Sequence, residues 1–214
     1  MDNWTNKPGY PVVHVTRYNR SIELHQRQFS FDGIQDNGVY FWIPITVATS
    51  SKPDFTTTWT NIWLGPQSKT IYLNESEDWV LVNVQQSGFY RVQYNYDSWN
   101  SIIKAIRTIN YGGIHVTNRA QIVDDSLNLA RADYISYWEA FEYVIYLKSE
   151  KEYLPWKAFF NGISYLLQRS DGHLAYDPLK AYIRYLASNM YKSLGFVDDE
   201  SDNHQRLLSR ELIL

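Results

Sequence analysis

The sequence predicts a multidomain protein of the all-β plus all-α class, with a β-sandwich followed by an incomplete α-helical array. Up to about residue 96, apolar residues alternate with polar ones, as half-buried strands require. Beyond that point the apolar residues recur at helical spacing. About seven short strands with closely spaced turns favour two packed sheets. We therefore assign residues 1–96 to the sandwich, with 1–10 as the junction to a preceding domain, and residues 97–214 to the helices.

The clearest strand is predicted at residues 39–48, where five apolar side chains from Val39 to Val47 fall on one side of the chain. Pro44 lies within this run and cannot donate to a ladder, so the strand should lie at an edge or contain a bulge. Further strands are expected at residues 12–18, 22–29, 58–64, 70–73, 79–84 and 89–94. The turns between them include Asp36-Asn37-Gly38 and Asn74-Glu75-Ser76-Glu77-Asp78.

The helical part carries start and stop signals. Ser136 followed by Glu139 predicts a capping box, and Asn118 followed by Gln121 resembles one. Pro155 suits a first helical turn, as does Pro178 in the next helix. The remaining signals are an apolar face of Trp99, Ile102, Ile103 and Ile106, a terminating Gly195, and a last helix beginning near Asp202.

The last predicted helix has an apolar side formed by Leu207, Leu208, Leu212 and Ile213. No later element of this chain can cover that side, and no C-cap glycine or polar tail follows it. We expect the helical array to be incomplete here and the chain to be part of a longer protein.

Composition excludes several classes of function. The net charge is −3 and no run of Lys and Arg forms a basic stripe, which argues against nucleic-acid binding. The chain has no Cys, so it has no disulfides, thiolate metal sites or cysteine nucleophile. No stretch approaches the ~20 apolar residues that cross a bilayer. The first residues also lack the basic and apolar regions of a signal peptide, so an anchor would lie outside this segment.

No catalytic or metal-binding residue is predicted. The five histidines are isolated in the sequence, and no HExxH, G-x-S-x-G, P-loop or Rossmann pattern occurs. Asp124 and Asp125 are adjacent, but neighbouring helical residues point about 100° apart, so the two carboxylates should not converge. We interpret them as belonging to a solvated helix in which one carboxylate pairs with Arg119 or Arg131.

Aromatic residues are abundant, with 18 Tyr, 8 Trp and 9 Phe. Five of them in the strand part could either stack on a sugar or fill the core of the sandwich. We favour the core, because aromatic residues commonly fill such sheets. The five are Tyr40, Trp42, Trp59, Trp63 and Trp79.

Three N-x-[ST] triplets are candidate glycosylation sites, beginning at Asn3, Asn19 and Asn74. Asn74 lies in a polar turn where a sugar needs no rearrangement of packing, and Asn19 lies in another predicted turn. Asn3 is close to the predicted domain junction, beside a Trp4 that should be packed there. If the protein is secreted, we expect occupancy to decrease in the order Asn74, Asn19, Asn3.

Five stretches of the chain together carry a family resemblance. They are residues 2–13 (DNWTNKPGYPVV), 88–94 (GFYRVQY), 118–131 (NRAQIVDDSLNLAR), 152–156 (EYLPW) and 204–210 (HQRLLSR). In this order, and along essentially the whole chain, they resemble the aminopeptidase N family of zinc metallopeptidases. The departures are small: Gln93 and Asn95 stand where Asn and Asp are usual, and Ser126 stands where Ala is usual.

The resemblance implies that this segment is the family's third domain, a β-sandwich, plus the start of its helical C-terminal domain. The parent protein would be a zinc aminopeptidase that removes N-terminal residues from peptides, often as an ectoenzyme at the cell surface. Its zinc ligands and catalytic residues would lie in the preceding domain. The implied partners are peptide substrates, that catalytic domain and the remaining helices, and a homodimer stays open.

Two other hypotheses are kept. One is a stand-alone β-sandwich that binds carbohydrate or protein, against which the ordered family motifs argue. The other is a segment of an inactive homologue. This sequence does not separate the inactive homologue from an active enzyme, because the deciding residues lie in another domain.

We predict that this chain, purified alone, binds no stoichiometric zinc and hydrolyses no aminoacyl chromogenic substrate. The reason is the absence of the HExxH pattern that supplies two zinc ligands and a general base. Elemental analysis and a chelator-controlled activity assay measure both properties. One tightly bound zinc per chain with chelator-sensitive hydrolysis would contradict the prediction.

Overall fold

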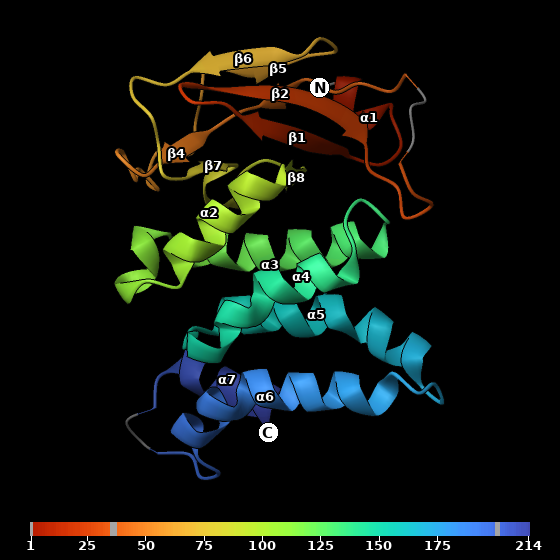
Figure 1. Cartoon of the computed structure of the whole chain (residues 1–214), viewed down its shortest axis with the longest axis vertical. Helices are drawn as coiled ribbons and strands as arrows, with labels where there is room; N and C mark the ends of the chain where they lie inside the picture. Colours follow the sequence, from red (N-terminus) through yellow and green to blue (C-terminus); the bar gives the residue numbers. More distant parts are fainter. Residues whose placement is uncertain (1, 35–37, 200–201) are drawn as a thin grey trace.

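A computed structural model describes residues 2–34, 38–199 and 202–214 (Figure 1). The strands gather at one end of the molecule and the helices follow in layers towards the other end, so the chain runs from red to blue along the long axis (Figure 1). Strands come before the main helices in the chain, as the periodicity predicts. One continuous hydrophobic core includes buried residues from both parts.

The largest sheet has four strands in the order β6-β2-β1-β8. Strand β1 (Pro11–Arg17) is antiparallel to β2 (Ser21–Gln28) and parallel to β8 (Arg91–Tyr94), and β6 (Lys69–Tyr72) pairs with β2. The other strands form two short ladders: β3 (Ile43–Pro44) with β5 (Trp63–Leu64), and β4 (Val47–Thr49) with β7 (Val80–Val82).

The described strands therefore form one sheet and two ladders, whereas the sequence predicted two packed sheets of a sandwich. The predicted strand at residues 58–64 is reduced to β5. The turn predicted at Asp36-Asn37-Gly38 lies, apart from Gly38, outside the described residues. The coarser prediction, a mixed protein with strands first and helices after them, agrees with the structure.

The strand predicted at residues 39–48 is wrong as a single element. Phe41, Ile43 and Ile45 are buried as the alternation requires, but burial then shifts by one position to Thr46 and Ala48. The chain changes partner at this point, leaving β5 and joining β7. Pro44 has no N–H to continue a ladder, which agrees with a break in pairing at this position.

The main helices begin and end close to the predicted positions, and the bounds of all helical elements follow. They are α1 (Asp2–Thr5), η1 (Val84–Gln86), α2 (Tyr96–Ile106), η2 (Ile109–Gly113), α3 (Val116–Arg131), α4 (Tyr137–Val144), η3 (Ile145–Ser149), α5 (Tyr153–Ser170), α6 (Tyr176–Leu194) and α7 (His204–Ile213).

Several local signals are confirmed and one is wrong. Ser136 and Glu139 form the predicted capping box, and Gly195 ends α6 with φ of +67°. Pro155 lies in the first turn of α5. The capping role assigned to Asn118 and Gln121 is wrong, because α3 already begins at Val116 and places both residues inside the helix.

Helix α3 is the centre of the helical part, packed against α4, α5 and the strands. Gly162 of α5 lies against α3, and an added Cβ there would lie 2.8 Å from Leu127 Cδ1. Helix α7 packs against α5 and α6, so its apolar side is partly covered. Leu207 is 37% exposed, whereas Leu208 and Leu212 are half-buried. The expectation that this side has no partner is therefore wrong in part.

His14 on β1 lies opposite His25 on β2, and their rings stack with centroids 4.5 Å apart. Tyr134, in the loop that precedes α4, covers His14 from the helical side, with ring centroids 6.0 Å apart. Burial lowers the pKa of His14 to about 3, with further lowering by His25 and Arg27. Sequence inspection treated both histidines as isolated because the pairing depends on strand register.

We predict that His14→Phe weakens the loss of stability in acid. The unfolded chain binds a proton at His14 near pH 6.5 but the folded chain only near pH 3, so the free energy of unfolding falls as pH drops below 6.5. Phe keeps an aromatic ring beside His25 and removes this titration. The difference in unfolding free energy between pH 7 and pH 5 should shrink by about 1–2 kcal/mol.

Denaturant unfolding at the two pH values measures the effect. His204→Phe, at an exposed position, is the control and should leave the pH dependence unchanged. An unchanged pH dependence in His14→Phe would show that burial of His14 does not control acid stability.

Candidate functional site at the strand and helix junction

One face of α3 is polar yet buried against the strands. Asn118, Gln121 and Asp125 follow one another at spacings of three and four residues, which places them on one side of the helix. Asn118 accepts from the Gln85 N–H (2.8 Å) and donates to the Asn83 carbonyl oxygen (3.0 Å). Asp125 Oδ2 accepts from the Val92 N–H (3.1 Å) and from Gln121 Nε2 (3.3 Å). These side chains bond backbone groups along β8 and the turn after β7.

Arg91, on β8, inserts between the two adjacent carboxylates of α3. Its Nη1 is 2.6 Å from Asp124 Oδ2 and 3.0 Å from Asp125 Oδ1. Its guanidinium carbon lies 5.8 Å and 5.2 Å from the ring centres of Tyr10 and Phe29. The expectation that the carboxylates do not converge is therefore wrong, because a long side chain from another element reaches both.

The pKa values follow from burial and mutual attraction. Burial raises the pKa of Asp125 to about 7; Arg91 lowers it and Asp124 adds to the rise. Burial alone would lower the pKa of Arg91, but Asp125 and Asp124 raise it above its ordinary value. Asp125 accepts from Arg91, the Val92 N–H and Gln121, so the geometry suits its ionised form.

A second buried ion pair fixes the other side of α3. Arg119 Nε is 2.7 Å from Glu150 Oε2, and both side chains are almost fully buried. The ring of Tyr111 lies 3.9 Å from the guanidinium carbon, and the Tyr146 hydroxyl donates to the Arg119 carbonyl oxygen. The predicted pairing of Arg119 with Asp124 or Asp125 is therefore wrong, because Arg119 pairs with Glu150. Arg131, the other predicted partner, instead stacks on aromatic rings.

The junction holds strands and helices together through paired charges. Each of its carboxylates, Asp124, Asp125 and Glu150, accepts from an arginine. Among the described residues, no group of three or more His, Asp or Glu is placed to hold a metal ion. Position 88, just before the junction, has little room for a side chain. A Cβ added to Gly88 would lie 2.3 Å from the Tyr90 ring.

The candidate glycosylation residues lie away from this junction. Asn19 is exposed in the turn between β1 and β2, and Asn74 is exposed two residues after the end of β6. Asn3 lies in α1, and its side chain is outside the described part of the structure. Trp4 is packed beside it as expected, donating to the Trp42 carbonyl oxygen (3.0 Å).

The aromatic residues assigned to the core mostly lie on the surface. Trp79 is buried, but Trp42, Trp59 and Trp63 are 53%, 72% and 48% exposed. In the β3–β5 ladder, Ile43 and Leu64 point inward, so Trp42 and Trp63 point outward. The core interpretation is therefore wrong for these three.

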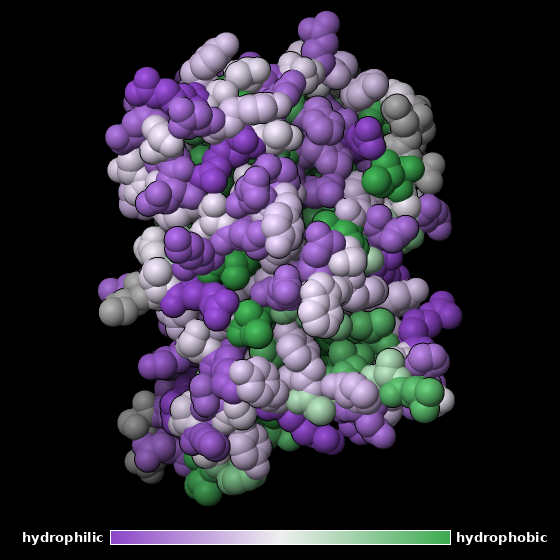
Figure 2. Space-filling model, in the orientation of Figure 1, coloured by the Kyte–Doolittle hydropathy of each residue, from purple (hydrophilic) through white to green (hydrophobic). Residues whose placement is uncertain are grey.

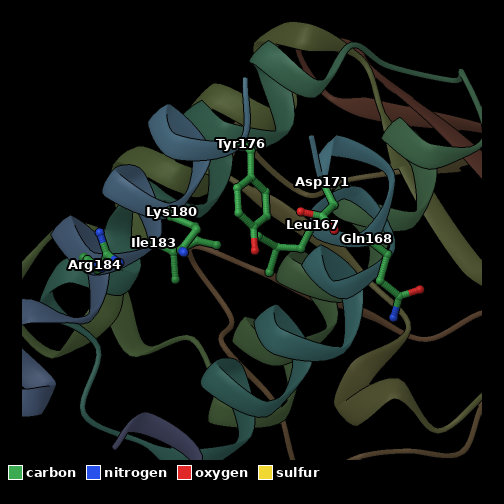
Figure 3. Close-up of a pocket in the computed structure, with 7 residues that line it drawn as sticks. All are labelled: Leu167, Gln168, Asp171, Tyr176, Lys180, Ile183 and Arg184. Atoms are coloured by element: carbon green, nitrogen blue, oxygen red, sulfur yellow. The ribbon is translucent and has the colours of Figure 1, made fainter. Parts of the chain in front are cut away.

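Two of the grooves in the described helical part bear on function. One, of about 510 Å³, lies between α5 and α6 (Figure 3). Tyr176 stands between the two helices there, Gln168 and Asp171 lie on the α5 side, and Lys180 and Arg184 lie on the α6 side (Figure 3). The other, of about 560 Å³, is apolar and lined by α4, α5 and α6. Hydrophobic side chains are also visible on the surface of the helical half (Figure 2).

We predict that Asp125→Ala destabilises the chain by about 3–5 kcal/mol. The substitution removes the buried one of the two carboxylates that contact Arg91, and it leaves the Val92 N–H without an acceptor. Asp124→Ala is the matched control. Its side chain is 29% exposed and its loss should cost about 1 kcal/mol or less. Denaturant unfolding of both variants measures the difference, and equal losses would contradict a junction centred on Asp125.

No described helix is both long and apolar enough to cross a bilayer. Residues 79–214 match the family described as the ERAP1-like C-terminal domain. The chain is 32% identical to Aminopeptidase N of Plutella xylostella, over all of this chain and 23% of that protein. It is 32% identical to Membrane alanyl aminopeptidase of Heliothis virescens (96% of this chain, 21% of that protein) and 33% identical to Aminopeptidase Ey of Gallus gallus (90% and 20%).

The chain therefore spans between a fifth and a quarter of the length of these curated relatives. Two of the five stretches that carry the family resemblance meet at the junction: residues 88–94 supply Arg91, and residues 118–131 supply Asp124 and Asp125. The agreement of motifs, family match and whole-chain identity shows that this chain belongs to the aminopeptidase N family and represents a C-terminal region of it.

Proposed function

We propose that this chain is a non-catalytic segment of a zinc aminopeptidase that removes N-terminal residues from peptides. Its strands connect the catalytic domain to the helical domain, and its helices help to close the substrate chamber. The observation that carries the proposal is the junction of Arg91 with Asp124 and Asp125, because it fixes the helices against the strands using the family's own motifs. The domain division at residues 96 and 97 is part of this proposal.

The zinc ion and the catalytic residues belong, in this proposal, to the preceding domain. No described residue group here would hold the metal, so no step of the reaction is assigned to this chain. The remaining helices of the C-terminal domain would pack on the apolar groove lined by α4, α5 and α6. Self-association into a homodimer stays a prediction.

We place the protein at the extracellular face of the plasma membrane, with its anchor outside this segment. The support is that curated relatives carry the names Membrane alanyl aminopeptidase and Thyrotropin-releasing hormone-degrading ectoenzyme, the latter 31% identical over 92% of this chain. The glycosylation candidates Asn74, Asn19 and Asn3 fit this location.

A second function has one observation in its favour. The exposed Trp42 and Trp63 point outward from the same ladder, as the side chains of a carbohydrate-binding surface would. The reading as a stand-alone sugar-binding module remains weaker, because it does not account for the buried polar junction with the helices. An inactive homologue would share every feature of this segment.

We predict that the full-length protein hydrolyses aminoacyl chromogenic substrates and that a chelator abolishes the activity.

We also predict that Lys180→Ala with Arg184→Ala lowers kcat/KM several-fold for long peptides and leaves the small substrate unaffected. Both cations line the α5–α6 groove, where they can attract the carboxylates of a longer peptide.

Steady-state kinetics on peptides of increasing length measure the groove effect. Lys192→Ala, an exposed cation at the other end of α6, is the control and should change neither substrate. No hydrolysis by the full-length protein would favour the inactive homologue. Equal losses on short and long substrates would argue against the groove as a peptide contact.

A further inference from the structure

Two of the candidate acceptor asparagines lie side by side at one corner of the four-stranded sheet. Asn19 is in the turn between β1 and β2, and Asn74 follows β6. Two hydrogen bonds join these turns. The Leu73 N–H donates to the Arg20 carbonyl oxygen (2.9 Å), and the Arg20 guanidinium donates to the Asn74 carbonyl oxygen (3.1 Å). Sugars on the two asparagines would therefore leave the surface from neighbouring turns.

Tyr72, the last residue of β6, lies close in the chain to one acceptor and close in the sheet to the other. Ile71 and Leu73 pack inward against the core, so Tyr72 between them points outward by strand alternation, and Asn74 in the following turn is exposed. Tyr72 is 83% exposed, which is unusual for a tyrosine in a strand. In the β2–β6 ladder it lies opposite Ser21, the third residue of the Asn19 triplet. One exposed aromatic ring is thus close to both glycosylation triplets.

Strand β6 is also an open edge. Within the described part of the chain it pairs with β2 alone, and it lies at the end of the sheet away from the helices (Figure 1). An edge strand presents unpaired backbone groups that can template pairing with another chain, and proteins usually cover or charge such edges. The opposite edge, β8, is covered by α3, with Asp125 accepting from the Val92 N–H. A bulky hydrophilic cover over β6 would protect this edge in an equivalent way.

We propose that Asn74 and Asn19 carry N-linked glycans and that the first sugar of the Asn74 glycan stacks on the ring of Tyr72, covering the edge of β6. In the transfer, Asn74 Nδ2 forms a bond to C1 of N-acetylglucosamine from a lipid-diphosphate-linked oligosaccharide, the amide proton is lost, and lipid diphosphate leaves. The apolar face of that sugar then contacts the aromatic ring. The inference rests on the extracellular location proposed above and is independent of peptidase activity.

The test uses the full-length protein expressed through the secretory pathway of cultured cells. Peptide mapping after enzymatic deglycosylation in ¹⁸O-water should find Asn74 and Asn19 occupied, with Asn74 the more fully so. Hydrogen exchange then compares three forms: intact glycans, glycans trimmed to the first sugar, and glycans removed. The β6 amides should exchange about threefold more slowly in the first two forms, as one aromatic contact would produce.

Two variants separate the ring from the sugar. Tyr72→Phe keeps the stacking surface and should keep the slower exchange, whereas Tyr72→Ala should abolish it while Asn74 remains glycosylated. A bare Asn74 in a protein glycosylated elsewhere would overturn the proposal, as would slower exchange that survives in Tyr72→Ala. A protein without any glycan would overturn both this proposal and the extracellular location, while leaving the peptidase assay to decide the proposed function.

Discussion

The structure depends on one constraint: side chains of α3 must bond backbone groups of β8 and of the turn after β7. The Val92 N–H bonds Asp125, and the Asn83 carbonyl oxygen and the Gln85 N–H bond Asn118. A buried backbone group without a partner costs about 1–3 kcal/mol, so these bonds favour the placement of α3 over the strands that makes all of them. Because α4 and α5 pack on α3, their positions follow from this placement.

Buried arginines make that placement specific. Arg91 reaches two carboxylates on the strand side of α3, and Arg119 reaches Glu150 on the opposite side. Replacing such pairs with apolar residues can leave stability unchanged, but removing one member leaves an unpaired buried charge. Their main effect is therefore to reject other registers of the helix. The connecting role proposed above would need this property, because a connecting segment must hold its neighbouring domains in a fixed relation.

The outer surface is arranged differently at the two ends of the molecule. The strand end presents Trp42, Trp63 and Tyr72 beside exposed turns, whereas the helical end presents grooves between helices. Neither surface takes part in the junction. Sugars, peptides or further helices could therefore bind these surfaces without disturbing the contacts that hold strands to helices.

The sequence by itself determined the features whose signals are local. Two-residue alternation located β1 and β2, and the Ser136 capping box and Gly195 fixed helix ends, because these patterns act over a few residues. Family motifs also identified the family. Only the tertiary structure decided which residues pair across 33 positions, as Arg91 does with Asp124. Alternation likewise shows that Trp42 and Ile43 point to opposite faces of the chain. It does not show which face is buried, because that depends on strands and helices distant in sequence.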